Sequence, residues 1–260
     1  MSFVINPYRF GGGGGGFTDP TDIAGLDLWL DASDNSTVLD SADTAAADDE
    51  GVKTWQDKSG NANHAVQTEN AAYRPLRRVA EINGLDVLDF DGVNDRFNGT
   101  SDLPQRQTDE KTIFVVSLLG ITAAQSPLSP YDSATLGARG TLFSSTVVNT
   151  GYAIAGGFWG SSDDIQGTTN AGLMTFTQSS TGDLHAAVGM RLDGVDLVRD
   201  AGTDRAFTDA AVGYTVGGWT SGGQWFDGNI CEIIVYNTEL SAGDIGDVET
   251  YLADKWGITI

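Results

Sequence analysis

The chain has 260 residues, of which 40% are hydrophobic, enough for one large β-sandwich or two small domains around a packed core. Acidic residues outnumber basic ones 36 to 14, and the net charge of -22 argues against nucleic-acid binding and insertion into anionic membranes. No apolar run reaches the roughly 18 residues of a membrane span. The single cysteine, Cys231, excludes an intrachain disulfide.

The first sixteen residues differ from the rest of the chain. Their apolar residues are followed by an unbroken glycine run at residues 11–16, which is expected to behave as flexible coil. Arg9 is the only basic residue among the first fifty. No basic segment precedes a long apolar core, so a signal peptide is not expected. We predict a docking peptide and linker over residues 1–16 and a single domain over residues 17–260, with docking residues Phe3, Ile5, Tyr8, Arg9 and Phe10.

Alternating apolar residues predict the first strand of the domain over residues 26–33. The acidic stretch 40–50 indicates a loop. Two dipeptides, Asn83-Gly84 and Asp193-Gly194, favour the positive φ angles of type I′ turns. They predict hairpins that join residues 79–82 to 85–90 and residues 186–192 to 195–198. Further strands are expected over residues 112–119, 141–145, 152–155, 214–217 and 230–236.

One helix is predicted near the end of the chain. Ser241 is a good N-cap, and Asp244 completes a capping box. Ile245, Val248, Leu252 and Trp256 follow at helical spacing and form one apolar face, and Gly257 ends the helix. This helix should close the domain, with Trp256 buried against the sandwich.

Several segments in order resemble the LamG-like, concanavalin A-like lectin/glucanase superfamily, in the version common in bacteriophage and bacterial surface proteins. They are residues 28–34, 55–65, 90–92, 228–237, 240–241 and 251–257, which frame roughly residues 22–260. The resemblance implies an all-β fold, a concanavalin A-like two-sheet jelly-roll sandwich, with the one C-terminal helix added. The leader, residues 5–10 with its polyglycine, resembles the starts of phage virion proteins.

No catalytic residue is predicted. Glucanases of this superfamily carry paired carboxylates on one strand face, but the position two residues after Glu232 is Ile234. Glu232 is therefore interpreted as a strand residue with a structural partner. Only two histidines, His64 and His185, are present, and Cys231 lies in an apolar strand where a lone cysteine usually packs.

No metal site or cofactor is predicted either, and calcium is kept as an alternative. Oxygen-bearing side chains alternate at Asp57, Ser59, Asn61 and Asn63, as in a calcium loop. Gly60 stands at the wrong place, however, and Thr68 occupies the position where such loops carry Glu. A polar turn whose side chains bond their own backbone is the preferred interpretation.

Glycan binding would use exposed aromatic rings near carboxylates and amides. Trp159 and Asp163 lie in one glycine-rich segment, and Trp219 lies in another, so these three are the candidate ligand-binding residues. The alternative is that each Trp caps the core. Trp29, Trp55, Trp225 and Trp256 lie in patterned segments and are assigned to the core.

The leading hypothesis is a non-enzymatic virion structural protein, such as a capsid decoration, spike or tail appendage. Its leader would bind other virion proteins or further copies of the chain, and its lectin-like domain would face host-surface glycans. It would be made in the host cytoplasm without a signal peptide and would end on the virion surface. The alternatives are a free soluble carbohydrate-binding lectin and, third, a glycoside hydrolase.

Overall fold

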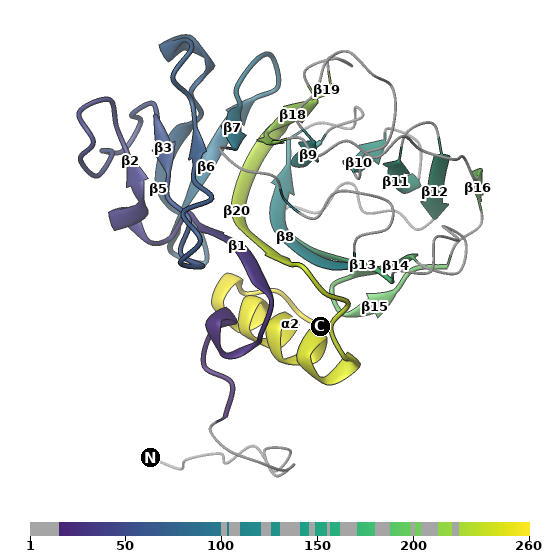
Figure 1. The fold of residues 1–260 in the computed structure, drawn as a ribbon. Helices are drawn as coiled ribbons and strands as arrows, with labels where there is room; N and C mark the ends of the chain where they lie inside the picture. Colours follow the sequence, from purple (N-terminus) through teal and green to yellow (C-terminus); the bar gives the residue numbers. More distant parts are fainter. Residues whose placement is uncertain are drawn as a thin grey trace.

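The long strand β20 (Asp227–Tyr236) lies at the centre of the computed structural model (Figure 1). The structure describes residues 16–99, 103, 110–120, 126–130, 141–145, 149–154, 157–161, 171–179, 188–198, 201–203, 213–219 and 224–260. Residues 1–15, and with them every predicted docking residue, lie outside this part.

Two antiparallel sheets form the sandwich. The larger has the order β15 (Val195–Asp196), β14 (Val188–Leu192), β13 (Gly172–Gln178), β8 (Lys111–Leu119), β20, β6 (Leu85–Asp91) and β5 (Leu76–Ile82), with β1 (Leu26–Asp31) also paired to β20. The smaller has the order β2 (Val38–Leu39), β3 (Thr54–Trp55), β4 (Ala65–Val66), β7 (Phe97–Gly99), β17 (Tyr214–Val216) and β9 (Leu128–Pro130). The predicted jelly-roll sandwich is confirmed.

Further elements flank the two sheets. Strands β10 (Thr141–Ser145), β11 (Asn149–Ile154), β12 (Gly157–Ser161) and β16 (Ala201–Thr203) form a four-stranded sheet, and β18 (Gly218–Trp219) pairs with β19 (Gln224–Trp225). Short 3-10 turns are η1 (Pro20–Asp22), η2 (Asn35–Thr37) and η3 (Ala71–Tyr73), and the C-terminal helix is α2 (Ala242–Trp256).

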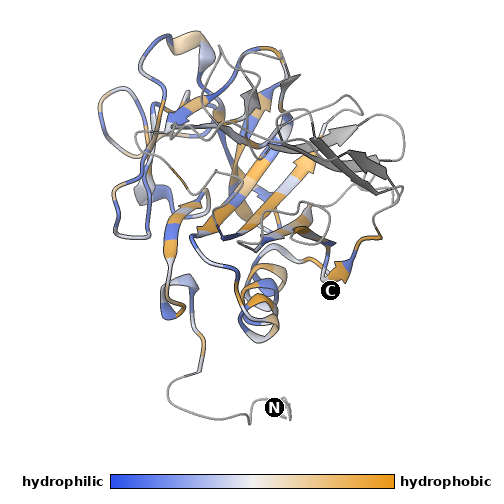
Figure 2. Ribbon diagram, turned by 45° about the vertical axis from the view of Figure 1, so that its right-hand side comes forward, coloured by the Kyte–Doolittle hydropathy of each residue, from blue (hydrophilic) through white to orange (hydrophobic). Residues whose placement is uncertain are grey.

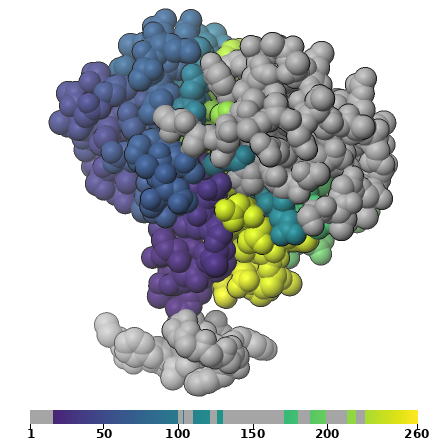
Figure 3. All heavy atoms as spheres, viewed as in Figure 1, coloured from purple at the N-terminus to yellow at the C-terminus, as the bar shows by residue number. Residues whose placement is uncertain are grey.

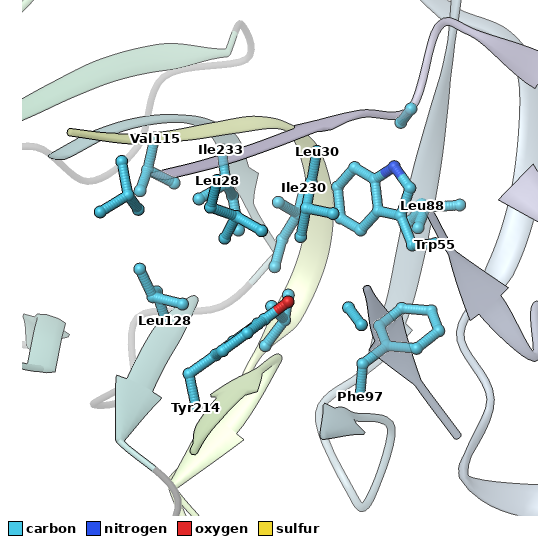
Figure 4. Packing of buried hydrophobic residues seen from close by; sticks show 14 of the residues in the cluster. Leu28, Leu30, Trp55, Leu88, Phe97, Val115, Leu128, Tyr214, Ile230 and Ile233 are labelled. Atoms are coloured by element: carbon cyan, nitrogen blue, oxygen red, sulfur yellow. The ribbon is translucent and has the colours of Figure 1, made fainter. Parts of the chain in front are cut away.

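The main core fills the space between the two sheets (Figure 4). Leu28 and Leu30 of β1 and Ile233 of β20 point into it from the larger sheet. Trp55 and Phe97 meet them from the smaller sheet, with ring centroids 6.2 Å apart. Burying one such large side chain stabilises the fold by about 1.5–3 kcal/mol, so this layer is the main source of stability.

Helix α2 covers the outer face of β20, which is why that strand is buried on both sides. Ile234 and Tyr236 point away from the main core and pack with Val248, Leu252 and Trp256 in a second cluster. Figure 2 shows that the strands in the middle of the molecule are largely hydrophobic. A register shift between Ile230 and Glu232 interrupts the alternation of β20. Trp256 is 2% exposed, so its predicted burial is confirmed.

The local signals for α2 and for both hairpins are confirmed. Ser241 Oγ accepts from the Asp244 backbone N at 3.2 Å, and Gly257 ends the helix with a left-handed φ of 71°. Asn83 and Gly84 have φ angles of 51° and 75°, and Asp193 and Gly194 have 48° and 76°, as type I′ turns require. Within the described residues, no helix is long and apolar enough to cross a membrane.

Strand boundaries agree less closely with the predictions. Strand β1 ends at Asp31 rather than continuing to residue 33, and β20 begins at Asp227 rather than at residue 230. Strands β10 and β17 lie within the predicted ranges, whereas β11 begins earlier than predicted. The two-residue strands β2, β3 and β4 were not predicted, because a period of two needs more residues than they have.

Candidate functional site

Glu232 is a structural residue at the junction of β1, β20 and α2. Its carboxylate accepts from the indole N–H of Trp29 and of Trp256, both at 2.7 Å, and from Lys255 Nζ at 2.7 Å. Burial raises the pKa of Glu232, and the charge of Asp31 adds to this. These partners all belong to the fold itself, and the side chain of Glu232 is 0% exposed. The interpretation of Glu232 as a partnered strand residue is confirmed.

Asp31 extends this network across the β1 strand. It pairs with Lys255 and with Lys58, each at 2.8 Å, and Lys58 also reaches Asp34 at 3.0 Å. Burial by itself would raise the pKa of Asp31, but Lys255 and the other donors outweigh it and hold that pKa below its usual range. The network therefore pairs its buried charges instead of leaving one exposed for chemistry.

The segment from Asp57 to His64 is a polar turn. Asp57 Oδ1 accepts from the backbone N of Trp29 and of Ser59, both at 2.9 Å, and Asp57 Oδ2 accepts from the Asn63 backbone N at 2.9 Å. Asn63 Nδ2 donates to the Asp27 carbonyl at 2.8 Å. The interpretation of this segment as a polar turn is confirmed, because its side chains form hydrogen bonds with backbone groups. In the part of the chain that is described, no group of three or more His, Cys, Asp or Glu side chains is arranged to hold a metal ion.

The predicted ligand-binding residues stay a prediction, because the structure describes only the backbone of two of them. The backbone of Trp159 lies in β12 of the four-stranded sheet, opposite Gly202. The backbone of Trp219 lies in β18, opposite Gln224 of β19. Asp163 lies outside the described residues. Trp219 nevertheless belongs to the hairpin that also carries Trp225, and this hairpin leads to a different group of residues.

A stack of three side chains lies where this hairpin meets β7, at the end of the molecule opposite α2 (Figure 1). The Arg96 guanidinium lies 4.3 Å from the ring centre of Tyr73 and 5.6 Å from that of Trp225. Arg96 Nη2 also donates to Glu69 Oε2 at 2.7 Å, and Asn98 Nδ2 donates to Glu69 Oε1 at 3.4 Å. We call Glu69, Tyr73, Arg96, Asn98, Thr215 and Trp225 the Arg96 site.

The assignment of Trp225 to the core is wrong. Trp225 is half-buried and belongs to neither core cluster, whereas Trp29, Trp55 and Trp256 are buried. The reason is the β17–β18 turn at Gly217, which has a φ of 87°. A Cβ there would come within 2.2 Å of the Phe90 ring, so glycine lets the chain turn sharply and fold the β18–β19 hairpin back over the smaller sheet.

Two polar atoms of the Arg96 site have no hydrogen-bond partner. Asn98 and Thr215 lie directly opposite each other in the β7–β17 pair, and Phe97 and Val216 beside them point into the core. Asn98 and Thr215 therefore project to the outer face of the smaller sheet. Asn98 Oδ1 and Thr215 Oγ1 are both buried and unpaired. Leaving such an atom unpaired costs about 1–3 kcal/mol, which a ligand hydroxyl would relieve.

The hairpin covers this face at Ser129 and Thr215, while Glu69 at its edge stays exposed. Ser129 Oγ of β9 donates to the Gly218 carbonyl of β18 at 2.6 Å, and Ser129 and Thr215 are both 0% exposed. The Arg96 site thus combines flat rings, a guanidinium, an exposed carboxylate and two unpaired oxygens. It offers ring faces for stacking and several groups for hydroxyl hydrogen bonds.

The sequence did carry a weak signal for this site. In residues 96–98, polar Arg96 and Asn98 flank apolar Phe97, which is the alternation of a half-buried strand. The other members come from residues 69–73, 215 and 225, which only the fold brings together. Residue spacing therefore does not reveal the site.

No protein-family model and no curated protein matches this chain. Among solved structures, the chain is similar to a Trypanosoma rangeli sialidase in complex with 2,3-difluorosialic acid, at 14% identity and a TM-score of 0.56. The matched region covers 90% of this chain and 33% of the sialidase, so the chain spans about a third of that protein's length. Domain 4 of AbnA, a GH43 extracellular arabinanase from Geobacillus stearothermophilus in complex with arabinotriose, matches at 13% identity and a TM-score of 0.57, over 86% of this chain and 98% of that domain.

The receptor-binding domain of botulinum neurotoxin D is also similar, at 10% identity and a TM-score of 0.55, over 91% of this chain and 56% of that one. At these identities the likeness shows the fold alone. It agrees with a β-sandwich, and the LamG type and the bacteriophage origin stay predictions from the sequence.

Proposed function

We propose that this chain binds a glycan at the Arg96 site and catalyses no reaction. The observation that carries this proposal is the pair of buried, unpaired oxygens of Asn98 and Thr215. The Asn98 amide binds Glu69, which also binds the Arg96 guanidinium that lies against Trp225. A sugar presents an apolar face of C–H groups and a rim of hydroxyls. The first would stack on an aromatic ring, and the second would satisfy the two oxygens and Glu69.

The fold is consistent with this proposal. The arabinanase domain that the chain resembles over nearly its whole length holds arabinotriose in its structure, and the sialidase holds a sialic acid derivative. The chain covers only a third of the sialidase, so the arabinanase domain is the stronger support. Both are similar in fold at low identity, and they support a sugar ligand without indicating which sugar or which face binds it.

The absence of catalysis is also a proposal, and the surroundings of Glu232 support it. A glycosidase needs two carboxylates that flank the sugar bond. Glu232 is buried beneath α2 and bonded to Trp29, Trp256 and Lys255, so a sugar would have to displace the helix to reach it. Turnover of a polysaccharide that disappears in Glu232→Gln would overturn this part of the proposal.

A glycan array followed by calorimetry tests the binding proposal. We expect the intact chain to bind at least one glycan, and Trp225→Ala to weaken that binding at least about tenfold, because the stacking surface is lost. Phe17→Ala is the matched control. Phe17 is a partly buried aromatic beside Tyr251 of α2, at the other end of the molecule, and its loss should leave affinity unchanged. Equal losses in the two variants, or no binding by the intact chain, would contradict the proposal.

We further propose that residues 1–16 attach the domain to a virion particle, at whose surface it would be displayed. The apolar and aromatic leader supports this, since such residues serve poorly as a solvated tail. The described structure adds the point where the leader leaves the domain. Phe17 packs edge-to-face on Tyr251, with ring centroids 6.2 Å apart, and Asp19 caps η1. Figure 3 shows this segment beside α2, so the leader starts from a fixed place.

A further inference from the structure

The loop between β6 and β7 links the two sheets and ends in the Arg96 site. Strand β6 of the larger sheet ends at Asp91, residues 92–96 cross to the smaller sheet, and β7 begins at Phe97. Asp95 thus directly precedes Arg96. The Asp95 carbonyl also lies 3.0 Å from where a Cβ on Gly217 would be, so the loop contacts the turn that leads into the β18–β19 hairpin. The loop therefore leads directly into Arg96 and also contacts the turn that precedes the hairpin carrying Trp225.

The Asp95 carboxyl is buried inside this loop, with 5% of the residue exposed. Its Oδ2 accepts from the Asp91 backbone N at 3.0 Å. In return, Asp91 Oδ1 accepts from the backbone N of Val93, Asn94 and Asp95 at 2.8, 3.1 and 3.3 Å. The two aspartates therefore fix the path of the whole loop.

The charged groups around Asp95 are mainly acidic. Asp89 and Asp91 lie on β6, and Asp227 of β20 is paired with Asp91 in register. The nearby cations are directed to other carboxylates: Arg78 Nε lies 3.0 Å from Asp89, and Arg96 binds Glu69. Burial, with the charges of Asp91 and Asp89 adding to it, raises the pKa of Asp95 to about 7. Burial and the same neighbours also raise the pKa of Asp227.

We propose that Asp95 is a pH-sensitive switch. When Asp95 is protonated, the Arg96 site keeps its binding geometry, and when Asp95 is ionised, that geometry is disturbed. This inference rests on the proposed glycan function of the same site. In the protonated form, Asp95 places no charge beside Asp91. In the ionised form, like charges meet in a buried loop, and the backbone that carries Arg96 and supports the Gly217 turn shifts to separate them.

The sign follows from proton binding. The folded state holds the Asp95 proton up to about pH 7, whereas an unfolded aspartate loses it near about pH 4. The stability that this proton contributes is complete below about pH 4 and is lost as the pH rises to about 7. Glycan binding should weaken in the same direction once Asp95 ionises.

The test measures affinity for the tightest-binding array glycan by calorimetry at about pH 6 and about pH 8. The intact chain should bind about fivefold more weakly at the higher pH, because most of the Asp95 population changes its protonation across this interval. Asp95→Asn keeps the shape and the oxygen that accepts from Asp91, and its affinity should be equal at the two pH values. Asp254→Asn removes an exposed carboxylate on α2 and should retain the full pH dependence.

Two outcomes overturn the inference while glycan binding stands: an affinity of the intact chain that is independent of pH, or a pH dependence of Asp95→Asn equal to that of the intact chain. If no glycan binds at either pH, the proposed function fails separately. Urea unfolding of the ligand-free protein then tests whether Asp95 titrates as the inference requires. The intact chain should lose stability between about pH 4 and pH 7 relative to Asp95→Asn, and parallel curves would refute the titration itself. Asp91→Asn, which removes one like charge, should move the transition to lower pH.

Discussion

The two ends of the sandwich both contain buried polar groups next to tryptophan, but they use them differently. At the α2 end, Glu232 receives hydrogen bonds from Trp29, Trp256 and Lys255. At the β18–β19 end, Asn98 Oδ1 and Thr215 Oγ1 have no partner, and Trp225 is half-buried. A carboxylate that is fully bonded by its own fold stabilises the structure, whereas buried unpaired oxygens are a cost to it, and the proposed glycan would offset that cost.

The same difference bears on Glu232, the carboxylate that the sequence offers as a glycosidase candidate. Glu232 and Asp31 are paired in register on β20 and β1, so two carboxylates do lie on adjacent strands. Helix α2 covers them, however, and Lys255 bridges them, with Nζ–O distances of 2.8 Å to Asp31 and 2.7 Å to Glu232. Burial and complete pairing, rather than the presence of two acids, decide the role.

The largest effect should come from Trp256 at the α2 end. Trp256→Ala leaves a cavity under α2 and removes one donor from Glu232, so unfolding should become easier by about 3–5 kcal/mol. Urea denaturation followed by circular dichroism measures this change. Ile258→Ala, a smaller truncation of a partly buried residue just after the helix, should cost clearly less. An unchanged melting temperature for Trp256→Ala would mean that the helix does not depend on this contact.

A smaller loss is expected when the charge of Glu232 is removed but its volume is kept. Glu232→Gln weakens the bonds to Lys255 and leaves that ammonium with less compensation, at a cost of about 2 kcal/mol. Glu81→Gln, an exposed residue of β5, is the matched control and should change stability by less than about 0.5 kcal/mol. Equal unfolding curves for the two variants would show that the network contributes nothing to stability.

The two ends also differ in how well the sequence predicts their structure. The α2 end was predictable because Ser241, the helical spacing up to Trp256 and Gly257 are local signals within one short segment. The Arg96 site was not predictable from the sequence. Its members come from η3, β7, β17, β19 and the loops that carry Glu69 and Arg96, and pairing across the sheet decides which side chains meet. Trp225 was assigned to the core because it lies in a patterned segment. The strand that forms there, β19, has only two residues, too few for a period that would determine the buried face.

At the β18–β19 end, stability and binding should separate. Thr215→Val replaces a buried, unpaired hydroxyl with a methyl group, so stability should stay within about 1 kcal/mol of the intact chain or increase. If that hydroxyl serves a ligand, glycan affinity should fall by about fivefold or more in calorimetry. Thr250→Val, on the exposed face of α2, is the control for the chemical change and should leave affinity intact. Lower stability with unchanged affinity would assign Thr215 to the fold, as at the other end.

The smallest effect on stability should come from the leader, although its effect on assembly should be complete. Deleting residues 1–10 removes no described contact, Phe17 still packs on Tyr251 of α2, and Asp19 and Asp22 still cap η1. The melting temperature should therefore be nearly unchanged.

The copy number in purified particles, measured by quantitative mass spectrometry, should fall to zero, because extended apolar peptides dock through buried aromatic anchors worth about 2 kcal/mol or more each. A full-length chain with serine in place of Phe3, Ile5, Tyr8 and Phe10 should fail in the same way, which separates loss of the anchors from loss of length. Assembly of either variant at the normal copy number would show that the leader is a tail, and the chain would then be better described as a free glycan-binding protein.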